Sequence, residues 1–460
     1  KDPSIDQSLL GHTYQVVMPM TVTKVKDGHT VENTATQVTN DRRDKTNTVT
    51  NPLKEINPKK DVTVKVGGDS IDGKSVYLNH TFLYRLDSSI LPPDRAYQTV
   101  TDWGGTDQLN TEYDQYLGNW AVYASRDLYR DGQMLAARGE KIAGSGFDSS
   151  KFGGNLFTVD ADDNGKVTAD ATQTYLDLVS ADNEHEAGWV LYLQCKRIAV
   201  ADEVPNTWTE TINGQPRESN KVVTKTPDMT PSIHLEKVDT PTLKQEGQEQ
   251  ADRDDPKQAL KMDADNIGIT FIITNTSKTD PATGDGAWYK ASDLNLADST
   301  IVGDAHVDMD SLTYPDNWDT LVLKPGESVS VTGTLKGVKE GDTHTDRAIV
   351  TGTPLVECAP SNGDPFNDKT DGGEDTDPEY STGDVTEIDG KQLCADTQTT
   401  SNTDDWNGYR AKPLASTGTA VLGLAGGALA VLLAGGSLLV FRKRHYAQGS
   451  GRHTAVNAGK

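Results

Sequence analysis

Residues 57–68 read NPKKDVTVKVGG, and this stretch decides the fold class that we predict for the chain. Val62, Val64 and Val66 alternate with polar residues, as in a β-strand with one face toward a core and one toward water. Comparable strands, with Gly, Asn and Asp turns between them, are predicted in TFLYRL (81–86), NWAVYA (119–124), GWVLYLQ (188–194), GITFIITN (268–275) and SVSVTGTL (328–335). We therefore predict an all-β protein built from two-sheet domains.

The composition limits the kinds of partner that we expect. The chain has 460 residues, a formal net charge of −25 and 34% hydrophobic residues, and its length is typical of about two to four domains. So few apolar residues can still fill cores when they alternate along strands. The strong negative charge argues against binding to nucleic acid, because phosphate groups would be repelled. The same charge fits a secreted, well-solvated surface.

No enzyme motif is present in the sequence. His185 and Glu186 are followed by Ala-Gly-Trp, so the zinc motif HExxH is absent. We also find no GxSxG nucleophile motif and no glycine-rich phosphate loop. We therefore expect neither hydrolase nor transferase activity, and no cofactor.

The C-terminal region carries a three-part pattern. LASTG (414–418) is followed by 23 uncharged residues (419–441) and then by the basic RKRH (442–445). As a helix the apolar segment would be about 35 Å long, which is enough to cross a hydrocarbon core of about 30 Å. The basic residues after it are expected to stay in the cytoplasm, with the acidic bulk outside. A permanent single-pass anchor is one interpretation.

The order of the three parts resembles the sorting signal of wall-anchored proteins in Gram-positive bacteria, in its LAxTG variant. By that resemblance a sortase cleaves between Thr417 and Gly418 and joins Thr417 to peptidoglycan. The chain would then be a membrane-anchored precursor that is secreted and fixed to the cell wall. The signal consists of Leu414, Ala415, Ser416, Thr417 and Gly418.

Two segments of the chain repeat each other. NTATQVTND starts at Asn33 and NTWTETING at Asn206, and each is followed fourteen residues later by a second Asn, Asn47 and Asn220. Matched segments at one spacing predict tandem copies of one domain. We expect the closing strands of a truncated repeat in 1–56, a complete copy in 57–228, a second β domain in 229–355, an acidic linker in 356–412, and the sorting signal with its transmembrane segment (419–441) in 413–460.

Several stretches resemble the C-terminal repeats of the streptococcal antigen I/II adhesins: NPKKDVTVKVGG, TFLYRLDSSILPPDRAY, DQYLGNW, YLQCKRIAV and SNKVVTKTP. GHTYQVVMPM with NTVTNP resembles the end of the preceding repeat. The resemblance implies variant Ig-type β-sandwiches, each closed by a Lys–Asn isopeptide bond. It also implies adherence to host glycoproteins and other bacteria, which in this family depends mainly on domains upstream of these repeats.

The alternation indicates which lysine would form this bond. Lys60 shares the face of Val62, whereas its rival Lys59 has the wrong parity. A lysine on a core face is costly unless it is neutral or paired, and a desolvated amine is a nucleophile. Asn220 shares parity with Val222, so we expect Asn220 to be the acceptor.

A buried carboxyl would assist the reaction by polarising the Asn carbonyl. Asp107, in GGTDQL, is the first choice because the family carries an acidic loop at this place. Asp87 is second, although it faces away from Phe82 and Tyr84, and Asp114 is third.

Further candidates come from the repeats and from the cysteines. We expect Asn47 to be the acceptor of the truncated repeat, and Lys237 with Asp346 is a candidate pair in the second domain. Cys358 and Cys394 are candidates for a disulfide, with two free thiols as the alternative.

One acidic stretch imitates the start of a calcium loop. Asp160, Asp162 and Asn164 occupy positions 1, 3 and 5, but Ala171 stands at position 12 in place of Glu, and a hairpin turn is the favoured interpretation. A calcium site elsewhere in the chain stays a candidate, since antigen I/II repeats often carry calcium.

These features predict the stalk region of a wall-anchored adhesin. Its expected partners are the sortase, peptidoglycan, and a receptor on host glycoproteins or bacterial surfaces, with the membrane as a transient partner before sorting. A passive stalk, or a pilus-like subunit that presents a separate binding head, is the alternative.

Overall fold

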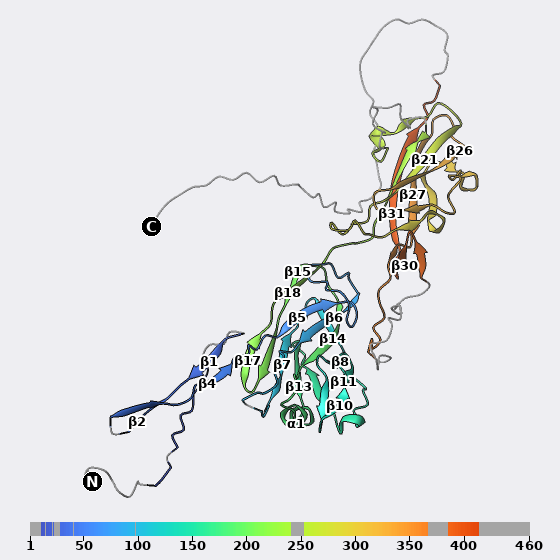
Figure 1. Cartoon of the computed structure of the whole chain (residues 1–460). Helices are drawn as coiled ribbons and strands as arrows, with labels where there is room; N and C mark the ends of the chain where they lie inside the picture. Colours follow the sequence, from blue (N-terminus) through green and yellow to red (C-terminus); the bar gives the residue numbers. More distant parts are fainter. Residues whose placement is uncertain are drawn as a thin grey trace, which may run out of the picture. The chain divides into compact units, whose positions relative to one another are not determined.

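The computed structural model describes residues 11–13, 15–20, 22, 28–39, 41–96, 98–240, 253–366 and 385–413 (Figure 1). Within these residues, no helix has the length and apolar character needed to cross a membrane. The sorting motif (414–418) and the apolar segment (419–441) lie outside the described residues.

The first complete domain consists mainly of two five-stranded sheets, in agreement with the predicted all-β class. One sheet has the order β11 (Lys141–Gly144), β8 (Asp114–Ala124), β14 (Trp189–Arg197), β6 (Thr81–Asp87) and β5 (Lys59–Thr63). The other has the order β12 (Phe157–Ala161), β13 (Lys166–Ala171), β7 (Trp103–Gln108), β16 (Trp208–Ile212) and β17 (Gln215–Glu218). Smaller pairs are β15 (Ala201–Asn206) with β18 (Val222–Thr226), and β9 (Leu128–Arg130) with β10 (Gln133–Ala136).

The core of this domain lies between the two sheets. Trp189 of β14 packs against Trp103 of β7 and Trp208 of β16, with ring centroids 6.2 and 5.8 Å apart. Burial of such large aromatic side chains from both layers is what stabilises a β-sandwich. The helix α1 (Gln173–Ala181), which the strand pattern did not predict, lies at the same end of the domain as β10 (Figure 1).

Strand β5 is shorter than the alternation of Val62, Val64 and Val66 suggests. Lys60 and Val62 are buried, and Lys59 is exposed, as the alternation predicts. However, β5 ends at Thr63, and Val64 is 62% exposed. The prediction that Val64 shares the core face is therefore wrong, because the chain leaves the sheet before reaching it.

The N-terminal hairpins reproduce the pairing of the first domain's last strands. β1 (Thr30–Asn33) pairs with β4 (Val49–Pro52), and β2 (Thr36–Thr39) pairs with β3 (Arg42–Lys45). Asn33 lies opposite Val49 as Asn206 lies opposite Val222. The strand pairs of the two segments have the same registers after one constant shift in residue number, which supports the predicted tandem repeat.

The second domain is also a sandwich. One sheet has the order β19 (Ile233–Asp239), β21 (Asn266–Asn275), β26 (Ser328–Lys336) and β24 (His306–Val307). The other has the order β20 (Leu260–Lys261), β31 (Thr400–Tyr409), β27 (Thr343–Gly352) and β23 (Asn295–Val302). Smaller sheets are β22 (Tyr289–Lys290) with β25 (Val322–Leu323), and β28 (Leu355–Glu357), β30 (Lys391–Ala395) and β29 (Thr386–Ile388).

The predicted acidic linker (356–412) needs correction. Its described C-terminal part contains β29, β30 and β31, and β31 lies beside β27 in the sheet (Figure 1). Trp406 of β31 is fully buried in the second core. The sequence of β31, TSNTDDWNGY, has almost no apolar alternation, because its inward positions include Asn402 and Asp404, whose side chains bond to β19.

Candidate functional site

A buried lysine with a carboxylate partner occupies the core of the first domain. Lys60 lies on β5 and its side chain is inaccessible to water. Its Nζ contacts Oδ2 of Asp107 on β7 and lies 4.4 Å from the centre of the Tyr84 ring. Burial lowers the pKa of Lys60, and the charge of Asp107 opposes that shift only in part. The amine is thus shifted toward its neutral, nucleophilic form.

Asn206 ends β15, two residues before Trp208 of β16, and the strand pattern did not single it out as a site residue. It is 6% exposed, and neither its Nδ2 nor its Oδ1 has a hydrogen-bond partner among the described residues. Trp208 lies two residues further along the chain, on the same buried face. It is opposite Asp107 in the sheet, and its Nε1 donates to the Lys59 carbonyl, 2.9 Å away. A buried amide without partners is costly, so its retention points to a chemical role.

Asn220, the acceptor expected from parity, lies differently. It is an exposed residue whose Oδ1 accepts from the Lys60 main-chain N–H at 3.0 Å, and whose Nδ2 donates to the Lys60 carbonyl at 2.8 Å. The Asn220 amide therefore continues the backbone pairing of β5. Both of its polar atoms are occupied by main-chain groups.

The other two candidate acids have partners of their own. Asp87 is half-buried and accepts from Arg85 at 2.8 Å. Asp114 is buried, lies 2.9 Å from Nε of the fully buried Arg197, and accepts from the Tyr84 hydroxyl at 2.8 Å. Of the three carboxyl groups, Asp107 is the one in contact with Lys60 Nζ.

A signal for Asn206 was present in the sequence. Asn206, Trp208 and Ile212 share one parity, so the first residue of NTWTETING falls on the face of two large apolar residues. By the same offset, Asn33 of β1 and not Asn47 corresponds to Asn206.

The three cysteines and the acidic turn that begins at Asp160 have structural roles in the two domains. Cys358, directly after β28, forms a disulfide with Cys394 of β30, with Cα atoms 4.9 Å apart, and Cys195 is buried as a free thiol. Asp162 Oδ1 accepts from the main-chain N–H groups of Asn164 and Lys166, each at 2.9 Å, and so closes the hairpin between β12 and β13. Among the described residues, no group of three or more His, Cys, Asp or Glu is arranged to hold a metal ion.

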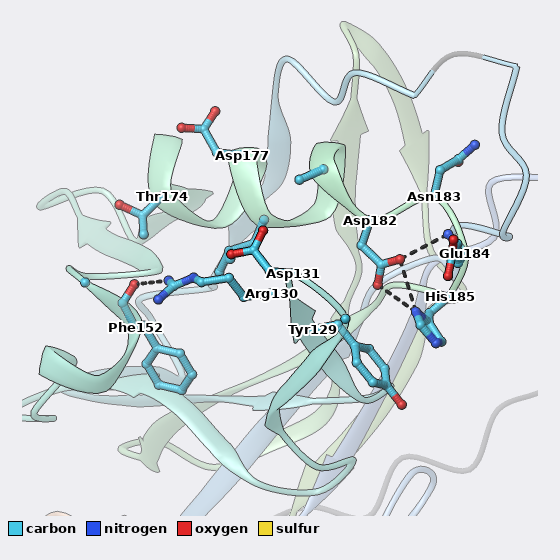
Figure 2. Close-up of a pocket in the computed structure, with 14 residues that line it drawn as sticks. Tyr129, Arg130, Asp131, Phe152, Thr174, Asp177, Asp182, Asn183, Glu184 and His185 are labelled. Carbon is cyan, nitrogen blue, oxygen red and sulfur yellow. Dashed lines mark hydrogen bonds and ion pairs between the residues drawn. The ribbon is translucent and has the colours of Figure 1, made fainter.

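A surface pocket lies between α1 and the turn that joins β9 to β10 (Figure 2). The Tyr129 ring stacks on His185 with centroids 3.8 Å apart, and His185 Nδ1 lies 2.9 Å from Asp182 Oδ2. Asp131 and Asp177 extend from the walls without converging on one point (Figure 2). The pocket therefore offers acidic side chains but no assembled reactive group.

Comparison with known proteins identifies the first half of the chain. Residues 57–227 match the family described as cell surface antigen C-terminus, and residues 2–53 match the cell surface antigen I/II C2 terminal domain. These two segments are therefore similar to C-terminal domains of cell surface antigens of the antigen I/II type. The matched families are cell-surface antigens and not enzymes, in line with the missing catalytic motifs.

A curated protein is also similar to about half of the chain. The aggregation substance of Enterococcus faecalis is 36% identical over 233 residues, which is 50% of this chain but 17% of that protein. The chain therefore spans less than a fifth of the length of this relative.

Solved structures with a similar region include the C-terminal domains of two streptococcal proteins. The antigen I/II-family protein AspA of Streptococcus pyogenes is 28% identical over 43% of this chain and 54% of that chain, with a TM-score of 0.38. BspA of Streptococcus agalactiae is 23% identical over 43% and 58%, also with a TM-score of 0.38.

Proposed function

We propose that this chain is the stalk region of a wall-anchored adhesin whose first complete domain is closed by an isopeptide bond between Lys60 and Asn206. The observations that carry the proposal are the buried contact of Lys60 with Asp107 and the buried amide of Asn206, which has no partner among the described residues. Asn206 replaces Asn220 as the proposed acceptor. In the N-terminal repeat the corresponding acceptor is Asn33.

The chemistry needs only these three side chains. Neutral Lys60 Nζ attacks the Asn206 side-chain carbonyl carbon, and protonated Asp107 donates a hydrogen bond to the oxygen that becomes negative. Asp107 then transfers protons from the amine to the leaving nitrogen. One amide bond forms, one amide bond breaks, and ammonia leaves. The water-excluded core holds the reacting groups together, so no enzyme is required.

The bond would join the beginning of the domain to its end. Lys60 lies on the first strand of the domain, and Asn206 lies on one of its last strands. By the loop-entropy model used for disulfides, a closed loop of this size constrains the unfolded chain by roughly 5 kcal/mol. Tension applied to the two ends would pass through the bond, which suits a stalk fixed to a cell wall.

Wall attachment and adherence form the second part of the proposal. The LASTG motif (414–418), the apolar segment and the basic tail support attachment to peptidoglycan by a sortase. The antigen I/II-type segments support a role in adherence to host or bacterial surfaces. The name of the Enterococcus faecalis relative, aggregation substance, agrees with contact between bacterial surfaces.

Mass spectrometry of the protein released from its own cell wall tests both parts. A digest should contain a peptide that joins Lys60 to Asn206 with the loss of one ammonia, and the last peptide should end at Thr417. Asn206→Ala and Asp107→Asn should each abolish the joined peptide, whereas Asn220→Ala should retain it. A joined peptide that contains Asn220, unmodified Lys60 in folded protein, or a chain that continues past Gly418 would contradict the proposal.

A further inference from the structure

The second domain contains a buried lysine between two carboxylates. Lys237 of β19 is fully buried, and its Nζ lies 2.5 Å from Oδ2 of Asp298 on β23 and 2.5 Å from Oδ2 of Asp346 on β27. The two aspartates sit on neighbouring strands, where Thr300 is the residue opposite Asp346. Their carboxylates therefore reach the amine from the same sheet, while the amine comes from the other sheet.

With a neutral His344, whose Nε2 lies 3.0 Å from Asp346 Oδ2, this arrangement is one proton short of neutrality. An ammonium between two carboxylates then leaves one uncompensated negative charge, and the ring centre of the apolar Phe271 is 5.5 Å from Nζ. An unpaired charge in such a place costs far more than the neutral form of the group. Uptake of one proton, with transfer of another from the amine, gives a neutral amine beside two neutral carboxyl groups.

We propose that Lys237 and Asp346 condense into an isopeptide bond, with Asp298 as the residue that transfers protons. The bond differs from the one in the first domain, because its acceptor is a carboxyl group and the leaving molecule is water. It lies outside the segments that match the antigen I/II families, 2–53 and 57–227.

Asp346 is the acceptor because its carboxyl group is the more enclosed of the two. It is fully buried, and its Oδ1 has no hydrogen-bond partner among the described residues. Oδ2, the oxygen that would leave, lies 3.0 Å from Nε2 of the buried His344. The neutral tautomer of His344 that carries its proton on Nε2 would donate a hydrogen bond to that oxygen and hold it in place.

Asp298 suits the transfer of protons. Its Oδ2 contacts the amine that must lose protons. Burial raises the pKa of Asp298, and the charge of Asp346 raises it further, against the opposing effect of Lys237. Its carboxyl group can therefore hold a proton at a pH where an exposed aspartate would not.

The atoms of the reaction balance. Neutral Nζ attacks Cγ of protonated Asp346 and forms the C–N bond. The Asp298 carboxyl group takes a proton from the nitrogen and delivers one to the Asp346 hydroxyl, which leaves as water when its C–O bond breaks. Condensation in water is normally unfavourable, but fixed neighbours in a dry core reach effective concentrations of roughly 10⁵ M or more.

Tandem mass spectrometry of the digested full chain tests the proposal. We expect a peptide that joins Lys237 to Asp346 and is lighter than the sum of its parts by one water. Asp298→Asn keeps the size of the side chain but cannot accept a proton, so the rate of joining should fall by roughly 100-fold. Circular dichroism of this variant and its Cys358–Cys394 disulfide check that the domain still folds.

Asp346→Asn is the variant matched to Asp298→Asn, because both replace an aspartate with an amide of the same size. It should still join to Lys237, now with the loss of ammonia, and yield the same amide product. Unmodified Lys237 in folded native chain, joining to Asp298 in place of Asp346, or full joining in the Asp298→Asn variant would each overturn the proposal. These peptides are separate from those of Lys60 and Asn206, so failure of one cross-link leaves the other measurable.

Discussion

The buried charged side chains of the two domains are each held by a specific partner. Glu210 accepts from the main-chain N–H and the hydroxyl of Ser89 and from Nε1 of Trp103, and Arg197 pairs with Asp114. Burial raises the pKa of Glu210, while these hydrogen bonds act in the opposite direction. Lys60 and Lys237 also contact carboxylate oxygens, but they differ from Arg197 because an amine that loses a proton becomes a nucleophile, whereas a guanidinium keeps its charge.

The titration of a single residue, Asp404, is expected to make the stability of the second domain depend on pH. Its Oδ2 accepts from the Lys237 main-chain N–H at 2.6 Å, yet burial, with added repulsion from Asp254 and Glu236, raises its pKa to about 8. The folded state therefore binds this proton more tightly than the unfolded state, whose value is 3.8. The contribution of Asp404 to stability is full below the unfolded pKa and is lost as pH rises toward the folded pKa.

We accordingly expect the second domain to unfold at a higher temperature at about pH 5 than at pH 8. Thermal unfolding followed by circular dichroism across this range measures the effect. Asp404→Asn, which keeps an oxygen for the Lys237 N–H, should remove most of the pH dependence. If the unfolding temperature of the variant changed with pH as steeply as that of the native chain, another group would control the pH dependence.

At the scale of elements, the small sheet of β28, β29 and β30 is fixed in two ways. Val356 lies opposite Cys394 in the β28–β30 ladder, and the disulfide from Cys358 joins the same strands. Leu355 and Leu393 pack with Trp288 in a separate apolar cluster. A three-stranded sheet of this size buries little surface, so the covalent link supplies much of its stability.

The double variant Cys358→Ala with Cys394→Ala tests that contribution. The disulfide closes a sequence separation of 36 residues, so its loss should destabilise the second domain by roughly 4 kcal/mol. Denaturant unfolding measures the change, with the transition of the first domain as internal control. An unchanged second transition would mean that the apolar cluster alone holds the sheet.

The elements also differ in how well sequence patterns predict them. The central strands β6, β14 and β21 were predicted closely, since each buries a run of large apolar residues. β31 was missed because several of its inward side chains are polar and take part in hydrogen bonds with β19. Apolar periodicity does not detect a strand that is held in this way.

For the whole molecule, the proposed cross-links determine how much chain can extend under force. The bond from Lys60 to Asn206 encloses 146 residues, and the bond from Lys237 to Asp346 encloses 109. Chain inside a closed loop cannot lengthen when the ends are pulled. A stalk with both bonds would keep most of each sandwich intact at forces that unravel ordinary β domains.

Single-molecule force measurements test this expectation. Lys60→Ala should release about 500 Å of additional extension, from 146 residues at roughly 3.4 Å each. Asn220→Ala, which removes hydrogen bonds but not the proposed bond, should show the native extension. Equal extension for Lys60→Ala and the native chain would contradict a closed loop in the first domain.

The sequence by itself determined the all-β class and the inward position of Lys60, because strand parity is a local property of the chain. Repeat spacing indicated the tandem copies, and the family resemblance suggested Asp107. Only the tertiary structure showed that Asn206 is buried while Asn220 is exposed, where β5 stops, and that β31 completes the second sandwich. It also brought Asp298 and Asp346 to one lysine. These outcomes depend on which strands become neighbours, and residues more than a hundred positions apart meet only after the sheets have packed.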